Sequence, residues 1–245
     1  INESQASHNF NNPLGRWVKK IGADAAVQEA FAWARTANPD ALYLINDYDV
    51  KDESYARQIR NLMESSTVPD AIGVQSHMHH GLWSDAELTA VYNRLAPLGI
   101  PIHFTELTVL SGRLMRNNDY SYERTDWKST PAGERRQAEE LVRIYRLLFS
   151  LPSVTAVTYW DFTDYGAWLG APAGLIREDL SPKPAYFYLM KLIHDEWHTD
   201  VATTVAENGE VRFSGFYGDY RIVVGDRETD FRFSAHGPDR VKVGL

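Results

Sequence analysis

Four short apolar runs in this sequence each end in side chains that could take part in chemistry. They are followed in turn by Asn46, Asp47 and Tyr48, by Gln75, His77 and His79, by Glu106, and by Trp160 and Trp168. Carboxyl and imidazole groups can move protons, and amides can hold the hydroxyl groups of a substrate. Seven Trp and thirteen Tyr supply aromatic rings, which either fill a core or pack on the apolar faces of sugars.

Taken singly, these residues remain open to simpler interpretations. Glu106 could be a glutamate salt-bridged at a strand end, and His77 could be a satisfied core histidine. The run HMHH at 77–80 invites a metal site, but a catalytic zinc needs about three protein ligands with a fixed second shell. Glu3 is either a charged residue on a frayed terminus or half of an active site.

The elements that must position these residues alternate between strand and helix. Helical spacing predicts helices at 25–37, 54–65, 84–99, 134–151 and 184–197, and apolar runs predict strands at 41–45, 71–75, 100–107 and 154–160. Such alternation is typical of parallel strands covered by helices. We expect a barrel rather than an open doubly wound sheet, because no glycine-rich phosphate loop follows a strand. In a parallel barrel the four polar strand ends meet at one rim.

The pattern changes after residue 197. Residues 198–245 alternate with a period of two and carry the turn signals NG, YGD and GD, which predicts a small antiparallel, β-sandwich-like appendage. We interpret it as a packing appendage, with carbohydrate binding through Phe216, Tyr217 and Tyr220 as the alternative. The polar stretch 116–134 predicts a long loop, which is usually functional or mobile.

The composition excludes several classes of protein. Hydrophobic residues make up 44% and charged residues 24%, and the net charge is −8. An acidic chain is a poor binder of nucleic-acid phosphates or of anionic membrane surfaces. No apolar run approaches the length of a membrane-spanning helix. Cysteine is absent, so disulfides and thiolate catalysis are excluded.

Six ordered motifs resemble one family of enzymes. They are INE, LYLINDYD, IGVQSHMHHG, IPIHFTEL, VTAVTYWDFTDYGAWL and LSPKPAYFYLMKLI, and they run from residue 1 to about 195. Their order and spacing are similar to those of glycoside hydrolase family 10, the endo-β-1,4-xylanases. The resemblance implies a (β/α)8 TIM barrel, of which residues 1–197 supply the end of strand 4 and roughly strands 5–8.

The resemblance also implies a retaining glycosidase without a cofactor or metal. Glu3 matches the acid/base and Glu106 the nucleophile. A retaining mechanism needs two carboxyl groups about 5–5.5 Å apart, of which one is kept protonated to serve as the acid. The other implied substrate contacts are Asn2 on the sugar 2-hydroxyl, His77 beside Glu106, Trp160 and Trp168 as walls, and Asn46, Tyr48 and Gln75.

This sequence departs from the family pattern at two positions. Thr108 stands where the family usually has an Asp that supports the histidine, so His77 is expected to have another partner. Asp161 follows Trp160 where the family commonly has glycine, which adds a carboxylate near the site.

The family's first four strands should precede INE. We therefore hypothesise that the chain is the carboxyl-terminal part of a larger protein, partnered by an amino-terminal half-barrel segment or chain. The expected function is hydrolysis of xylan or xylo-oligosaccharides by a secreted or periplasmic enzyme, with no nucleic-acid or membrane partner. The alternatives are an inactive, xylan-binding fragment and a metal-dependent barrel hydrolase.

Overall fold

The computed structural model describes residues 1–115, 126–234, 237 and 240–244. They divide into two compact units, Ile1–Tyr188 and Leu189–Leu245. Most of the predicted loop at 116–134 lies outside the described residues. None of the described helices is long and apolar enough to cross a membrane.

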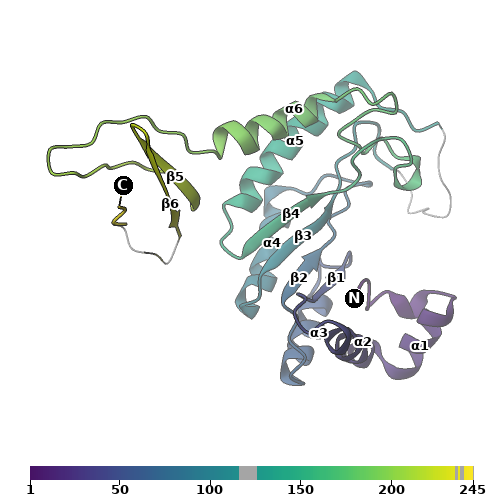
Figure 1. The fold of residues 1–245 in the computed structure, drawn as a ribbon. Coiled ribbons are helices and arrows are strands. Elements are labelled where there is room, and N and C mark those ends of the chain that lie inside the picture. Colours follow the sequence, from purple (N-terminus) through teal and green to yellow (C-terminus); the bar gives the residue numbers. More distant parts are fainter. Residues whose placement is uncertain (116–125, 235–236, 238–239, 245) are drawn as a thin grey trace. The chain divides into compact units, whose positions relative to one another are not determined.

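The first unit contains a four-stranded parallel sheet (Figure 1). Its strands are β1 (Leu44–Asp47), β2 (Ala71–Val74), β3 (Ile102–Leu107) and β4 (Val154–Tyr159), and their order in the sheet is their order in the chain. Because crossovers between parallel strands are right-handed, this order places the intervening helices on one face of the sheet. The parallel strands and helices predicted from the apolar runs are confirmed.

Helices follow or precede each strand. They are α1 (Pro13–Ile21), α2 (Ala23–Ala37), α3 (Glu53–Glu64), α4 (Asp85–Leu95), α5 (Pro131–Phe149) and α6 (Pro184–Lys191), with 3-10 turns at Ser7–Asn9, Ala96–Leu98 and Trp168–Gly170 and a π-helical turn at Leu192–Glu196. Helix α4 begins at a capping box that the Ser84 and Glu87 side chains form. Helix α1 was not predicted from the sequence; Asn12 caps it by accepting from Gly15 N.

The first strand lies later in the chain than the apolar run at 41–45 indicated. Asn46 and Asp47 belong to β1 itself, because their backbones pair with Gly73 and Val74 of β2. Glu106 lies within β3, as the predicted strand at 100–107 implied. An apolar pattern ends where side chains become polar, whereas the backbone ladder continues two residues further to the rim.

The core lies between the sheet and its helices. Tyr55 of α3 is fully buried, and its hydroxyl lies 3.0 Å from Ile45 O and 2.9 Å from Gly73 O. This ties α3 to β1 and β2 at once. The remaining large side chains with no exposed surface include Phe104, Ile59, Leu62, Ile72, Leu88 and Ile102.

The second unit contains one two-stranded antiparallel sheet in its described residues. Strand β5 (Gly218–Val224) pairs with β6 (Arg227–Phe233), and Tyr220 stacks on Phe231 with ring centroids 5.3 Å apart. The opposite face carries the ion pair between Arg221 and Asp230.

A buried ion pair joins three segments at the rim of the first unit. Lys183 has no exposed surface, and its Nζ donates to Asp164 Oδ1 at 2.7 Å and to Ser111 Oγ at 2.9 Å. Burial lowers the pKa of Lys183 and raises that of Asp164, although their mutual attraction opposes both shifts. The ion pair therefore adds little net stability to the fold, because the cost of removing both charges from water offsets their attraction. Removing one partner is destabilising, because it leaves an unpaired buried charge.

We predict that Lys183→Met lowers the free energy of unfolding by about 3–5 kcal/mol, because Asp164 is left buried without its cation. The double variant Lys183→Met/Asp164→Asn should recover part of this loss. Lys128→Met is the matched control, since Lys128 and Glu178 form an exposed pair at 3.5 Å, and it should cost less than about 1 kcal/mol. Urea unfolding measures all three, and equal losses for the two single variants would contradict the prediction.

Candidate active site

Residues 1–3 run parallel to β1 and extend the sheet by a short bridge. Asn46 N donates to Ile1 O at 2.9 Å, and Glu3 N donates to Asn46 O at 2.7 Å. Glu3 has a φ of 52°, a left-handed conformation that non-glycine residues seldom adopt and that often occurs at functional sites. The backbone of β1 therefore holds Glu3 at the rim. Sequence reasoning had found no strand to do this, because three residues are too few to show a period.

The side chain of Asn46 connects the bridge to β3. Its Nδ2 lies 2.6 Å from Asn2 Oδ1 and 2.8 Å from Glu106 Oε1, and its Oδ1 accepts from Thr105 Oγ1 at 2.6 Å. Gly73 leaves room for this amide, since a Cβ there would lie 2.4 Å from Asn46 Oδ1. The amide is thus fixed on every side by hydrogen bonds or by close packing.

Gln75 makes the corresponding link to the other glutamate. Its Nε2 donates to Glu3 Oε1 at 3.1 Å and to Asn2 Oδ1 at 3.2 Å, and Asn2 Nδ2 also donates to Glu3 Oε1 at 3.0 Å. A single network of side-chain amides therefore extends from Glu3 through Asn2 and Asn46 to Glu106. The structure brings together five residues that the sequence had predicted separately.

Glu106 accepts hydrogen bonds on both oxygens. Oε1 accepts from Asn46, and Oε2 lies 2.9 Å from His77 Nε2. Burial raises the pKa of Glu106, but the hydrogen bonds from His77 and Asn46 outweigh it and leave the pKa below its ordinary value. Glu106 is therefore an ionised, oriented carboxylate at neutral pH.

The second hydrogen-bond partner of His77, besides Glu106, is Thr108 itself. Nδ1 of His77 lies 2.9 Å from Thr108 Oγ1, which also lies 2.9 Å from the carbonyl oxygen of Trp160. A hydroxyl thus takes the place expected for a carboxylate. Thr105 and Thr108 belong to the network but were not named as site residues, because a threonine at a strand end carries no signal of its own.

Aromatic rings surround His77. The ring centroids of Trp160 and Trp168 lie 6.0 Å and 5.1 Å from that of His77, and each tryptophan keeps 39% of its surface exposed. Tyr48 is about half exposed. Asp161 accepts from Trp168 N at 3.2 Å, and burial raises its pKa. The two indoles therefore cover His77 and still offer surface to a ligand.

His79 lies behind this aromatic wall. Only 1% of it is exposed, and its ring lies 5.0 Å from that of Trp168 and 6.3 Å from that of Trp127. Burial, with the charges of His77 and His80, lowers the pKa of His79 to about 3. Within the described residues, no three His, Cys, Asp or Glu side chains lie close enough together to hold a metal ion.

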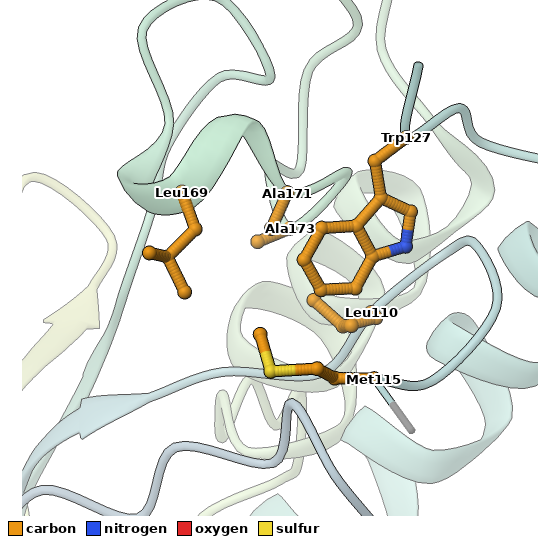
Figure 2. Packing of buried hydrophobic residues seen from close by; sticks show 6 residues of the cluster. All are labelled: Leu110, Met115, Trp127, Leu169, Ala171 and Ala173. Atoms are coloured by element: carbon orange, nitrogen blue, oxygen red, sulfur yellow. The ribbon is translucent and has the colours of Figure 1, made fainter. Parts of the chain in front are cut away.

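A hydrophobic cluster supports the same wall (Figure 2). It joins the segment after β3 to the segment around Trp168, so that Leu169 is packed in place directly beside the exposed indole. Trp127 Nε1 donates to Arg113 O at 2.9 Å and fixes its ring. The members of the cluster are Leu110, Met115, Trp127, Leu169, Ala171 and Ala173.

Comparisons with known proteins agree on one family. The model of glycosyl hydrolase family 10 matches residues 1–192. Endo-1,4-beta-xylanase B of Thermotoga neapolitana is 27% identical, over 74% of this chain and 51% of that protein. Anti-sigma-I factor RsgI6 of Acetivibrio thermocellus is 29% identical, over 87% of this chain and 26% of that protein.

The solved structures give the same result. Xylanase 10B from Thermotoga petrophila RKU-1, in complex with xylobiose, aligns at 26% identity with a TM-score of 0.61, covering 80% of this chain and 59% of that one. Neighbours of this kind imply a (β/α)8 barrel. The chain therefore spans between a half and two thirds of the length of these xylanases.

We predict that His79 makes the fold less stable in acid. Its pKa of about 3 in the folded protein lies below the ordinary value of about 6.5, so the unfolded chain takes up a proton in this window and the folded chain does not. The free energy of unfolding should fall as pH falls, with a contribution of up to about 1.4 kcal/mol per pH unit from this group.

Urea unfolding at about pH 7 and about pH 4.5 measures the effect in the natural protein and in His79→Phe. The variant lacks the titrating ring and should lose less stability between the two conditions. Because other groups titrate equally in both proteins, the difference between the two losses isolates His79. Equal losses would show that the ring is not held neutral.

Proposed function

Because the chain belongs to glycosyl hydrolase family 10, we propose that it carries the catalytic carboxyl-terminal part of a retaining endo-β-1,4-xylanase. The observation that supports this most directly is the network of amides between Glu3 and Glu106. It holds two carboxyl groups at one rim of a parallel sheet, where catalytic residues of β/α barrels lie. The substrate follows from the family and from two of the three named relatives, Endo-1,4-beta-xylanase B and xylanase 10B.

The environments of the two glutamates differ in a way that supports different roles for them. Glu106 is held ionised by His77 and Asn46, as a nucleophile requires. Glu3 receives its hydrogen bonds from the neutral amides of Asn2 and Gln75. In the first step Glu106 attacks the anomeric carbon while Glu3 gives its proton to the leaving oxygen. In the second step water attacks the glycosyl ester, and Glu3 takes a proton from that water.

The remaining residues position the sugar. Asn2 has an exposed side chain next to Glu3, and we assign it to the 2-hydroxyl of the sugar under attack, where a hydrogen bond strengthens in the oxocarbenium-like transition state. Trp160 and Trp168 offer exposed indole surface for pyranose rings. Tyr48, exposed after β1, extends this surface. Because xylan is a polymer met outside the cytoplasm, the proposal includes secretion or a periplasmic location.

Substitution of the two glutamates tests their proposed catalytic roles. We expect Glu106→Gln to abolish turnover of xylan while xylo-oligosaccharide binding survives, and Glu3→Gln to lower kcat by about 10²–10⁴-fold, the usual contribution of a general acid. Glu139→Gln, an exposed glutamate on α5, is the matched control and should be unchanged. Initial-rate kinetics and calorimetric binding measure these effects.

The stereochemistry of the product gives a second readout. Proton NMR during hydrolysis should first detect the β-anomer, since a retaining enzyme inverts the anomeric carbon twice. Initial formation of the α-anomer would contradict the nucleophilic role of Glu106. Binding without turnover in the natural protein would favour a non-catalytic xylan-binding role, and loss of turnover on chelation would favour a metal-dependent hydrolase.

The outer edge of β4 supports an additional half-barrel. In the part of the chain that the structure describes, β4 pairs only with β3, and an unpaired sheet edge invites a further strand. Large apolar side chains of the same unit are also exposed, as expected of a surface that is covered in the whole protein. They include Phe162, Leu180 and Phe187, with 66%, 73% and 56% of their surface exposed.

Hydrogen exchange tests this part of the proposal. In the longer protein, the β4 amides that point away from β3 should be protected, whereas in the 245-residue chain alone they should exchange rapidly. Strand β2 has neighbours on both sides and is the internal control, protected in both samples. Equal exchange of the β4 amides in both samples would contradict the proposal that a further strand pairs with β4 in the longer protein.

A further inference from the structure

We propose that the Thr108 hydroxyl donates to Nδ1 of His77 and so places the single proton of a neutral His77 on Nε2, facing Glu106. Thr108 is then a positioning residue for the nucleophile. The inference rests on the proposed function only for the role of Glu106, because the hydrogen-bond assignment itself follows from the geometry around His77.

The carboxylate of Glu106 decides one side of the imidazole. It lies 2.9 Å from Nε2, and an ionised carboxylate can only accept hydrogen bonds. Nε2 must therefore carry a proton, because two lone pairs facing each other at this distance would repel. A neutral imidazole has one proton in total, so Nδ1 is left as an acceptor.

Thr108 is the group that Nδ1 meets, at 2.9 Å. A hydroxyl can donate to a bare ring nitrogen, whereas a carboxylate at the same place could only accept from a protonated one. An aspartate there would require the doubly protonated imidazolium. Threonine removes this requirement, because both nitrogens also have partners when the ring is neutral.

The hydroxyl has two backbone acceptors within reach besides Nδ1. Its oxygen lies 2.9 Å from Trp160 O and 3.3 Å from Glu106 O, and one proton cannot serve Nδ1 and a carbonyl together. While His77 is neutral, the proton points to Nδ1. If His77 becomes an imidazolium, Nδ1–H donates to Thr108 Oγ1 and the hydroxyl proton turns to Trp160 O. The backbone of Thr108 is fixed in both states, since its carbonyl accepts from Met78 N at 3.1 Å.

The consequence concerns the charge on the nucleophile. The titratable side chains that interact with His77 are Glu106, Asp161 and His79, and burial keeps His79 neutral down to a pKa of about 3. A neutral His77 orients Glu106 without a full positive charge, and neutral hydrogen bonds are about half as strong as charge-assisted ones. Glu106 therefore keeps more of its negative charge available for attack, and Thr108 determines this through the ring.

The test is a long-range proton–nitrogen NMR spectrum of the full protein labelled with ¹⁵N-histidine, at about pH 8. We expect Nε2 of His77 protonated and Nδ1 unprotonated in the natural protein and in Thr108→Ser, which keeps the hydroxyl. Thr108→Asp should have both nitrogens protonated. A protonated Nδ1 in the natural protein, or an unprotonated one in Thr108→Asp, would overturn the assignment.

Kinetics provide a second measurement on the same variants. Thr108→Val, which keeps the shape and loses the hydroxyl, should lower kcat/KM about tenfold, and Thr108→Ser should stay within about twofold. Thr108→Ser keeps the hydroxyl that Thr108→Val lacks, so rescue of the rate by serine would tie the effect to the hydroxyl rather than to packing. An inactive protein with the expected NMR spectrum would overturn the proposed xylanase function and leave the Thr108 assignment standing.

Discussion

The side-chain amide of Asn46 is the contact on which the rest of the site depends. Its NH2 group faces Asn2 on one side and Glu106 on the other, and its oxygen accepts from Thr105. Through these hydrogen bonds Asn46 connects residues 1–3, which lie on one side of β1, to β3. The backbone of the same residue also pairs with Ile1 and Glu3. One residue therefore fixes both the position of Glu3 and the orientation of Glu106, and the absent side chain of Gly73 leaves the space that its amide occupies.

The strands and helices followed from the sequence because apolar periodicity reports burial directly. All four parallel strands were predicted, and so were the helices between them. The end of the first strand was less well predicted, as Asn46 shows, because rim residues are polar while their backbones still pair. Helix α1 was missed although its signal was present, because Leu14, Trp17, Val18 and Ile21 recur at helical spacing between Pro13 and Gly22.

The site could be predicted in its members but not in its connections. The motifs named Glu3, Asn2, Asn46, Gln75, His77 and Glu106, and the structure brings these residues into one network. The sequence could not predict which amide bonds which carboxylate, because that depends on side-chain rotamers at a shared rim. It also gave no anchor for Glu3, which comes from β1. His79 differs from His77 in its burial and in lacking the hydrogen bonds that His77 forms with Glu106 and Thr108, and a run of three histidines in four residues reveals neither difference.

The hydrogen bonds that hold the two glutamates come from residues 2, 46, 75 and 77, all within the strands and rim segments of this chain. The open edge of β4 and the exposed apolar side chains near it lie on different residues. The orientation of the glutamates therefore does not depend on closure of the sheet. The glutamates are oriented by residues of β1–β3 and their rim, whereas closure of the sheet would cover apolar surface and pair the free backbone edge of β4. A further half-barrel would stabilise the fold and complete a substrate cleft, whereas the polarisation of Glu106 would already be set by His77 and Asn46. Such a division allows the acid–base geometry to be preserved even if the rest of a barrel is supplied by another segment.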